Sequence, residues 1–319
     1  MHHHWHFSNN CNIKPVGRLI LILFVMFIKF YSITAQTDTT TSVVIKTPRW
    51  RLPFVLSTGA SVFAGSITGL NYLWYEGYPR SSFHVFNDNH EWMGMDKAGH
   101  AYTAYVSGAI CSDLLRWAGV KRKTAIWTGG TAGFVYLSAI EILDGFSEQW
   151  GFSWGDMIAN ASGSALYITQ QLLWDEQRFQ FKFSYWPSEY PKQRPELLGS
   201  NFAENILKDY NAQTYWLSCN IWSFLPNRNQ RKFPKWLNVS VGYGANGMLG
   251  GAFNPIPFEH IQRYHQFYLS LDLDLTKIPT RSKAVRTLLK TLNYIKFPAP
   301  TLEFTTHPDY PVRFHWLMF

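Results

Sequence analysis

Four apolar stretches in the first half of the chain limit its fold more than any other feature of the sequence. Each is near the length of a membrane-spanning helix, but Gly, Ser and Thr residues dilute it, so insertion into a bilayer would be marginal. Each also carries two small residues four positions apart, which let helix backbones approach closely. We therefore expect a tight four-helix bundle, in a bilayer or beside one. The stretches are 54–75, 97–118, 124–143 and 154–174, with the pairs Gly65 and Gly69, Ala104 and Gly108, Gly129 and Gly133, and Ala159 and Gly163.

Beyond residue 174, helical spacing gives way to alternation of apolar and polar residues. Phe267, Leu269 and Leu271, for example, alternate with Tyr268 and Ser270, which is typical of strands. About six such strands resemble those of outer-membrane proteins, but closed bacterial barrels have about eight or more, so we expect a β-layer packed on the bundle. The expected strands include 179–185, 215–223, 237–243, 267–275 and 312–319, with turns at 242–251 and 254–257 and helices at 201–209 and 281–295.

The predicted fold class is therefore α+β, with an N-terminal four-helix apolar bundle followed by an antiparallel β-layer and one or two extra helices. The helix at 281–295 has a basic side and an apolar side. It suits either an interfacial helix on an anionic surface or an amphipathic helix that covers the sheet.

The N-terminus has the pattern of a signal peptide. Lys14 and Arg18 precede an apolar run at 19–28 that is too short for a comfortable membrane span, and Ala35 precedes a polar segment. An uncleaved anchor is the alternative. We expect four regions: a signal peptide at 1–35, a linker at 36–53, the helical bundle at 54–175 and a β-rich region at 176–319.

Composition favours contact with lipid. Charged residues make up 16% of the chain, against roughly 25% in soluble domains, and aromatic residues reach 17%. A soluble protein with a large aromatic core is the alternative. The net charge is +8, and removing Lys14, Arg18 and Lys29 with the signal peptide (8 minus 3) leaves +5.

The basic residues cluster in short groups at 121–123, 228–235 and 277–290. Such groups suit anionic headgroups better than a nucleic-acid groove, and no nucleic-acid motif accompanies them. We therefore expect membrane lipid or envelope glycan as partner and no nucleic acid, while protein partners and cofactors are unknown. Of Cys11, Cys111 and Cys219, the last two would remain after processing, and free thiols are more expected than a disulfide.

Polar residues gather where three of the apolar stretches begin or end. If consecutive helices pack antiparallel, the start of 97–118, the end of 124–143 and the start of 154–174 lie at the same end of the bundle. Their polar side chains can then converge into a binding site. The expected binding residues are Asp96, Lys97, His100, Glu141, Asp144, Ser153, Asp156 and Asn160, and the catalytic candidates are His100, Glu141 and Asp156.

Several of these residues also have purely structural interpretations. Asp96 has the position of a helix N-cap, and Ser153 to Asp156 has the spacing of a capping box, in which Asp156 would only satisfy backbone N–H groups. The helix dipole does not explain Glu141 and Asp144, because a helix C-terminus disfavours negative charge. They require a cation, which His100 or Lys97 could supply in an ion-pair network. A metal ion is the alternative, and we assign no metal site.

The motifs also carry a resemblance to known proteins. Asp-Lys-x-x-His at 96–100, Glu-x-x-Asp at 141–144 and Ser-Trp-Gly-Asp-x-x-x-Asn-x-x-Gly at 153–163 resemble the YfiM-like family, described as predicted periplasmic lipoproteins of unknown function. A more distant similarity is to the VanZ-like membrane proteins. The resemblance covers residues 50–175 and implies an envelope protein with a helical core and no established reaction. The chain departs from the lipoprotein pattern, since Cys11 precedes the apolar run and no cysteine directly follows it.

Three hypotheses about function follow. The leading one is an exported, membrane-associated envelope protein whose polar cluster binds a lipid headgroup or a glycan fragment. The second is a hydrolase acting on lipid or cell-wall material, with His100 or Glu141 as general base and Asp156 as orienting partner or ligand. The third is a scaffold for envelope partners. The loop at 76–95 could form a lid, although a surface loop packed by its own aromatic rings is more expected.

Overall fold

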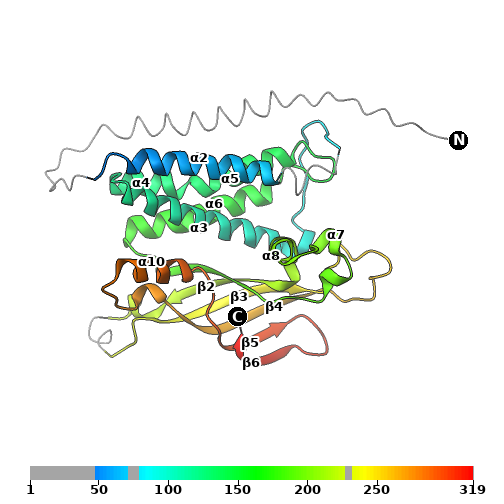
Figure 1. Cartoon of the computed structure of the whole chain (residues 1–319). Coiled ribbons are helices and arrows are strands. Elements are labelled where there is room, and N and C mark those ends of the chain that lie inside the picture. The colour runs from blue at the N-terminus through cyan, green and yellow to red at the C-terminus, as the bar shows by residue number, and fades with distance from the viewer. Residues whose placement is uncertain (1–46, 71–78, 227–231, 319) are drawn as a thin grey trace.

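The protein consists of a helical layer and a sheet layer packed on one another (Figure 1). The computed structural model describes residues 47–70, 79–226 and 232–318. The expected signal peptide and most of the expected linker lie outside these residues. Helices in the first half of the chain precede a six-stranded antiparallel sheet, so the predicted α+β fold is confirmed.

Three predicted helices lie close to their expected positions. α3 spans Met95–Trp117 and α6 spans Trp154–Leu173. The expected helix at 124–143 is divided into α4 (Arg122–Gly130) and α5 (Ala132–Asp144). The division falls at Thr131, whose hydroxyl donates a hydrogen bond to the carbonyl of Trp127, and two glycines of low helix propensity precede it.

Helix α2, Arg51–Leu70, lies on the outside of the bundle (Figure 1) and begins within the expected linker. None of its residues is buried. Two helical stretches in the described part of the chain, α2 and the continuous pair α4–α5, are long and apolar enough to cross a membrane. Length and composition alone are weak evidence for insertion, and 44% of the apolar window of α4–α5 is buried in the bundle, against 6% for α2.

Glycines allow α3, α4, α5 and α6 to pack with their backbones in contact. A Cβ atom added to Gly163 would lie 2.0 Å from the carbonyl oxygen of Ala101, and one added to Gly129 would lie 2.3 Å from the backbone nitrogen of Ser112. The small residues thus have the expected role in these helices. The expectation was wrong for α2, because Cβ atoms added to Gly65 and Gly69 would meet no atom of the described residues within 4 Å.

The sheet is a meander in which each strand pairs with the next along the chain, in the order β1 to β6. β5 was not among the strands named from the sequence, and the first part of the expected turn at 242–251 belongs to β3. The strands are β1 Phe179–Tyr185, β2 Gln213–Asn220, β3 Leu237–Asn246, β4 Tyr264–Leu273, β5 Ala299–Thr305 and β6 Val312–Met318.

Short helices connect these strands. The expected helix at 201–209 is α8, Phe202–Lys208, and the expected helix at 281–295 contains α10. No residue of α10 is buried, so α10 does not cover the sheet with a buried apolar side. The remaining elements are α7 Pro195–Leu198, α10 Lys283–Leu292, and the 3₁₀ helices η3 Glu91–Gly94, η4 Tyr190–Lys192, η5 Tyr210–Ala212, η6 Ile221–Phe224 and η7 Leu275–Lys277.

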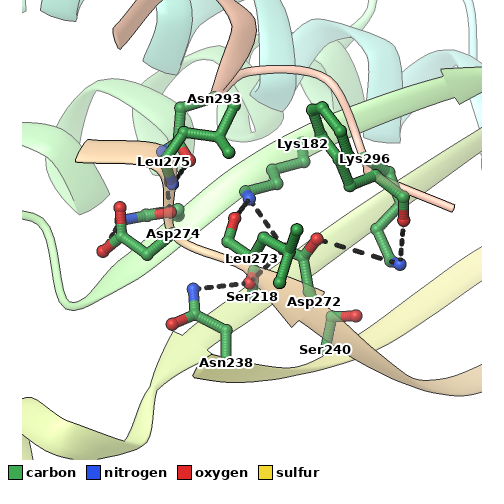
Figure 2. Close-up of polar contacts among 12 residues, drawn as sticks. Lys182, Ser218, Asn238, Ser240, Asp272, Leu273, Asp274, Leu275, Asn293 and Lys296 are labelled. Carbon is green, nitrogen blue, oxygen red and sulfur yellow. Dashed lines mark hydrogen bonds and ion pairs between the residues drawn. The ribbon is translucent and has the colours of Figure 1, made fainter. Parts of the chain in front are cut away.

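The sheet is rolled so that its polar face lies inside. Lys182 on β1 reaches across the roll to Asp272 on β4, with 2.7 Å between Nζ and Oδ2, and both side chains are fully buried. Ser218 on β2 donates a hydrogen bond to the same carboxylate, and Lys296 lies on its other side (Figure 2). Buried charges are stable only when they are paired, and in the rolled sheet Lys182 and Asp272 pair with one another.

Helix α3 packs against the convex, apolar face of β1 and β2. The ring of Tyr102 lies 5.7 Å from that of Phe183 and 5.8 Å from that of Tyr215, and the ring of Tyr105 lies 6.0 Å from that of Phe181. Aromatic contacts therefore join the helical layer to the sheet.

Cys111 and Cys219 are both free thiols.

Candidate functional site

The ends of three helices meet at one end of the bundle, as the sequence predicts. Lys97, near the start of α3, places its ammonium group 3.0 Å from Asp156 at the start of α6. The same ammonium lies 2.9 Å from Asp96 and 2.6 Å from Asp88. We call this group, with His100, Glu141, Asp144, Ser153 and Asn160, the carboxylate cluster.

His100 lies between α5 and α6 within the cluster. Its Nδ1 atom lies 3.0 Å from Oδ1 of Asn160, and its Nε2 atom faces Oε1 of Glu141 at 3.7 Å and Oδ1 of Asp156 at 3.9 Å. The amide oxygen can only accept, so in this orientation Nδ1 carries the proton. The Nε2 atom then faces two carboxylates at distances too long for hydrogen bonds.

Ser153 is the N-cap of α6, and its hydroxyl accepts a hydrogen bond from the backbone N–H of Asp156. The same hydroxyl donates to Asp88, and the backbone N–H of Ser153 donates to Glu141. Asp156 therefore does more than cap α6, because its carboxylate also pairs with Lys97.

Asp96 is not the N-cap of α3, which was one interpretation of its position. The N-cap is Gly94, in a left-handed conformation, and Asp96 lies in the first turn with its carboxylate on Lys97. Trp92 and Met93, just before it, also have positive φ angles. Such conformations cost energy in bulky residues and persist where surrounding structure fixes them.

Asp88 was missed by the sequence analysis, although it lies at the centre of the cluster. It comes from the loop before α3, whose described part runs from residue 79. Residues of this loop bridge to the segment between α5 and α6, and the ring of Phe83 packs against those of Phe146 and Phe152. The loop before α3 is therefore held not only by its own aromatic rings but also by rings of the segment between α5 and α6. The position of Asp88 shortly before the motif at 96–100 was its only signal in the sequence.

Burial and crowding of like charges shift the pKa values within the cluster. Burial, together with Asp156 and Asp144, raises the pKa of Glu141 to about 9. Burial also raises the pKa of Asp156, to about 6, although His100 and Lys97 oppose that rise. Burial alone would raise the pKa of Asp88, but hydrogen bonds from Lys97 and Ser153 outweigh it and lower that pKa. Near neutral pH, Glu141 is therefore protonated.

The raised pKa of Glu141 predicts a loss of stability with rising pH. Because the pKa is higher in the folded than in the unfolded protein, the stabilisation is complete below an unfolded pKa of about 4.3 and is lost as pH rises toward the folded pKa. We expect Glu141→Gln, which keeps an acceptor for the N–H of Ser153, to unfold at similar denaturant concentration at pH 4. At pH 8 the variant should be the more stable protein, by up to about 1.4 kcal/mol for each pH unit crossed. An equal pH dependence in both proteins, measured by denaturant unfolding, would contradict the assignment.

Two trios of side chains in the described part of the chain could hold a metal ion. Ligand atoms of His100, Glu141 and Asp156 lie within 4.8 Å of one another, as do those of Asp88, Asp96 and Asp156. The ammonium of Lys97 already pairs with all three carboxylates of the second trio, where a metal ion would have to displace it. The first trio has the nitrogen and oxygen donors that suit several divalent metals.

The fold and the cluster together define a protein in which a small helical bundle, joined to a rolled antiparallel sheet, encloses carboxylates at one end of its helices. Residues 84–171 match the family described as "Predicted periplasmic lipoprotein (DUF2279)". The matched region includes α3 to α5, all but the last two residues of α6 and every residue of the carboxylate cluster, while the sheet lies outside it. No curated protein and no solved structure matches the chain. These findings support neither the YfiM name nor the similarity to VanZ-like proteins.

Proposed function

We propose that this is an exported, membrane-associated protein of the cell envelope whose carboxylate cluster binds an ammonium group of a lipid headgroup or of a glycan fragment. The envelope location is supported by the signal-peptide pattern of the N-terminus and by the description of the family that residues 84–171 match. On this proposal the cluster binds its ligand and does not catalyse a reaction.

The excess of carboxylates over cations in the cluster carries this proposal. Four acidic side chains, those of Asp88, Asp96, Glu141 and Asp156, lie around Lys97 and His100. The charge of Asp144 acts on Glu141. Lys97 pairs with Asp88, Asp96 and Asp156, so one ammonium serves three carboxylates. Among the described residues, the only basic side chain paired with Glu141 is that of His100, at 3.7 Å. The raised pKa of Glu141 means that a further positive charge beside it would be stabilised once its proton leaves.

Access to the cluster comes from the side of His100 and Lys97. Their side chains are 21% and 17% exposed, whereas those of Glu141 and Asp156 are almost completely buried. A ligand ammonium entering past His100 would meet acceptors that water does not reach, where charge-assisted hydrogen bonds are strong. The hydrolase hypothesis then depends on His100 as the general base, because a protonated Glu141 cannot act as one near neutral pH.

Calorimetric titration of the purified protein with glycerophosphoethanolamine and with glucosamine tests the proposal and separates the lipid from the glycan source. Because Glu141 is protonated at pH 7, binding should release a proton, so the measured heat should depend on the ionisation enthalpy of the buffer. We expect the double variant Glu141→Gln, Asp156→Asn to bind at least about tenfold more weakly, the size of effect seen when one strong charged contact is lost.

Asp175→Asn is the matched control, since Asp175 pairs with Arg122 at an exposed site outside the cluster. It should bind as the unaltered protein does. Failure of both ammonium ligands to bind would overturn the proposal. So would tight binding of Zn²⁺ or Mg²⁺ alone that excludes both ammonium ligands, because the cluster would then be a metal centre.

A further inference from the structure

We propose that the convex face of β3–β6 contacts the acyl chains of a lipid bilayer. This outer face of β3–β6 is apolar and exposed, and no described segment covers it. Its residues are Val241, Phe267, Leu269, Leu271, Leu302, Phe304, Val312, Phe314 and Trp316.

The polarity of the sheet is the reverse of that found in water-soluble sheets. Along β4, Ser270 and Asp272 point inward and are buried, while Leu269 and Leu271 point outward and are 43% and 46% exposed. A soluble antiparallel sheet buries its apolar side and leaves its polar side in water. Strands that face lipid have this arrangement, with polar and charged residues on the inner side and apolar residues on the outer side.

The exposed apolar residues form continuous rows across four strands. Val241 pairs with Leu269, Leu269 with Leu302, and Leu302 with Phe314. A second row lies directly beside it, running through Phe267, Phe304 and Val312 on β4 to β6. With neighbouring strands about 4.8 Å apart, the first row is about 15 Å wide and the second about 10 Å, far more than a scatter of single exposed residues.

Basic and aromatic side chains border one end of this face. Lys235, just before β3, lies over the ring of Trp222. Lys277, after β4, lies over the same ring and also pairs with Glu176, so Lys235 is the cation that carries the argument. Trp236 beside them is exposed, and α10 follows with its amphipathic sequence. Trp residues and cations at the edge of an apolar band suit the headgroup layer of an anionic membrane. Two copies of the chain joined face to face would gain nothing from these cations.

The inference shares membrane association with the proposed function but uses none of the residues of the carboxylate cluster. A protein that binds no ammonium ligand could therefore still contact lipid through this face. Conversely, loss of lipid contact here would leave binding at His100 and Glu141 unchanged. The two proposals can thus fail separately.

A fluorescent label on the outer face of β3–β6 tests the inference in the full chain. Leu302→Cys, in a background with Cys11, Cys111 and Cys219 changed to Ser, takes an environment-sensitive dye, and Leu207→Cys on α8 is the matched exposed control. Vesicles of phosphatidylglycerol and phosphatidylethanolamine carrying acyl-chain nitroxides should quench the label at Leu302 at least about twofold more than the control label. Thermal unfolding of the background variant checks that it folds.

Because the label reports its own position, binding through the N-terminal apolar run cannot mimic the result. Equal quenching at both positions, or no quenching at Leu302 in protein that is bound to the vesicles, would overturn the inference. A label at Leu302 that is already shielded without vesicles, in a protein of doubled molar mass, would also overturn it and identify a second copy as the occupant.

Discussion

Replacing Asp272 with asparagine should lower the free energy of unfolding by about 3–5 kcal/mol, the range measured when one partner of a buried ion pair is removed. Asp272 is the carboxylate between Lys182 and Lys296, at 2.7 and 3.8 Å, and all three side chains are inaccessible to water. The variant leaves two buried ammonium groups without this countercharge. Denaturant unfolding at pH 7 measures the loss.

The loss should be smaller at pH 10. Burial already lowers the pKa of Lys296 to about 8 while Asp272 opposes that shift. Without the carboxylate the folded pKa of Lys296 falls further, so its share of the loss is full below the pKa of the variant. This share disappears as pH rises through about 8, above which Lys296 is neutral in both folded proteins. Adding Lys182→Met to the variant should restore part of the stability, because it removes one uncompensated charge.

The control for this experiment is Asp175→Asn, at the exposed pair of Asp175 with Arg122. Exposed pairs contribute about 0–1 kcal/mol, and asparagine tolerates the positive φ angle of this position. A loss at Asp272 no larger than that at Asp175 would show that the polar interior of the sheet is open to water.

Gly163→Ala should destabilise the protein, whereas the same substitution at Gly65 should not. The new Cβ at Gly163 would lie 2.0 Å from the carbonyl oxygen of Ala101, so α3 and α6 must move apart. We expect overpacking to cost about 3 kcal/mol, offset by about 1 kcal/mol of improved helix propensity. Gly65→Ala meets open space and should gain about 0.5–1 kcal/mol.

Thermal unfolding of the two variants side by side measures this difference. It also tests whether a small residue at position 163 is needed for the close packing of α3 against α6. Similar midpoints for both variants would contradict the close approach of α3 and α6.

Most residues of the carboxylate cluster could be predicted from local sequence patterns. The motifs at 96–100, 141–144 and 153–163 lie at helix ends, and the packing of the helices then brings His100, Glu141 and Asp156 together, as predicted. Asp88 was missed because its place depends on a loop fixed by contacts to the segment between α5 and α6. No helical or strand period marks such a loop residue.

The sequence by itself determined the type and order of most elements, because apolar spacing sets helices and strands wherever one side of an element is buried. It also determined that the two faces of each strand differ. Only the tertiary structure decided which face lies inside, because alternation is the same for either choice. Lys182 on β1 and Asp272 on β4, far apart in sequence, pair on the inward polar face, while the apolar rows of β3–β6 lie on the surface.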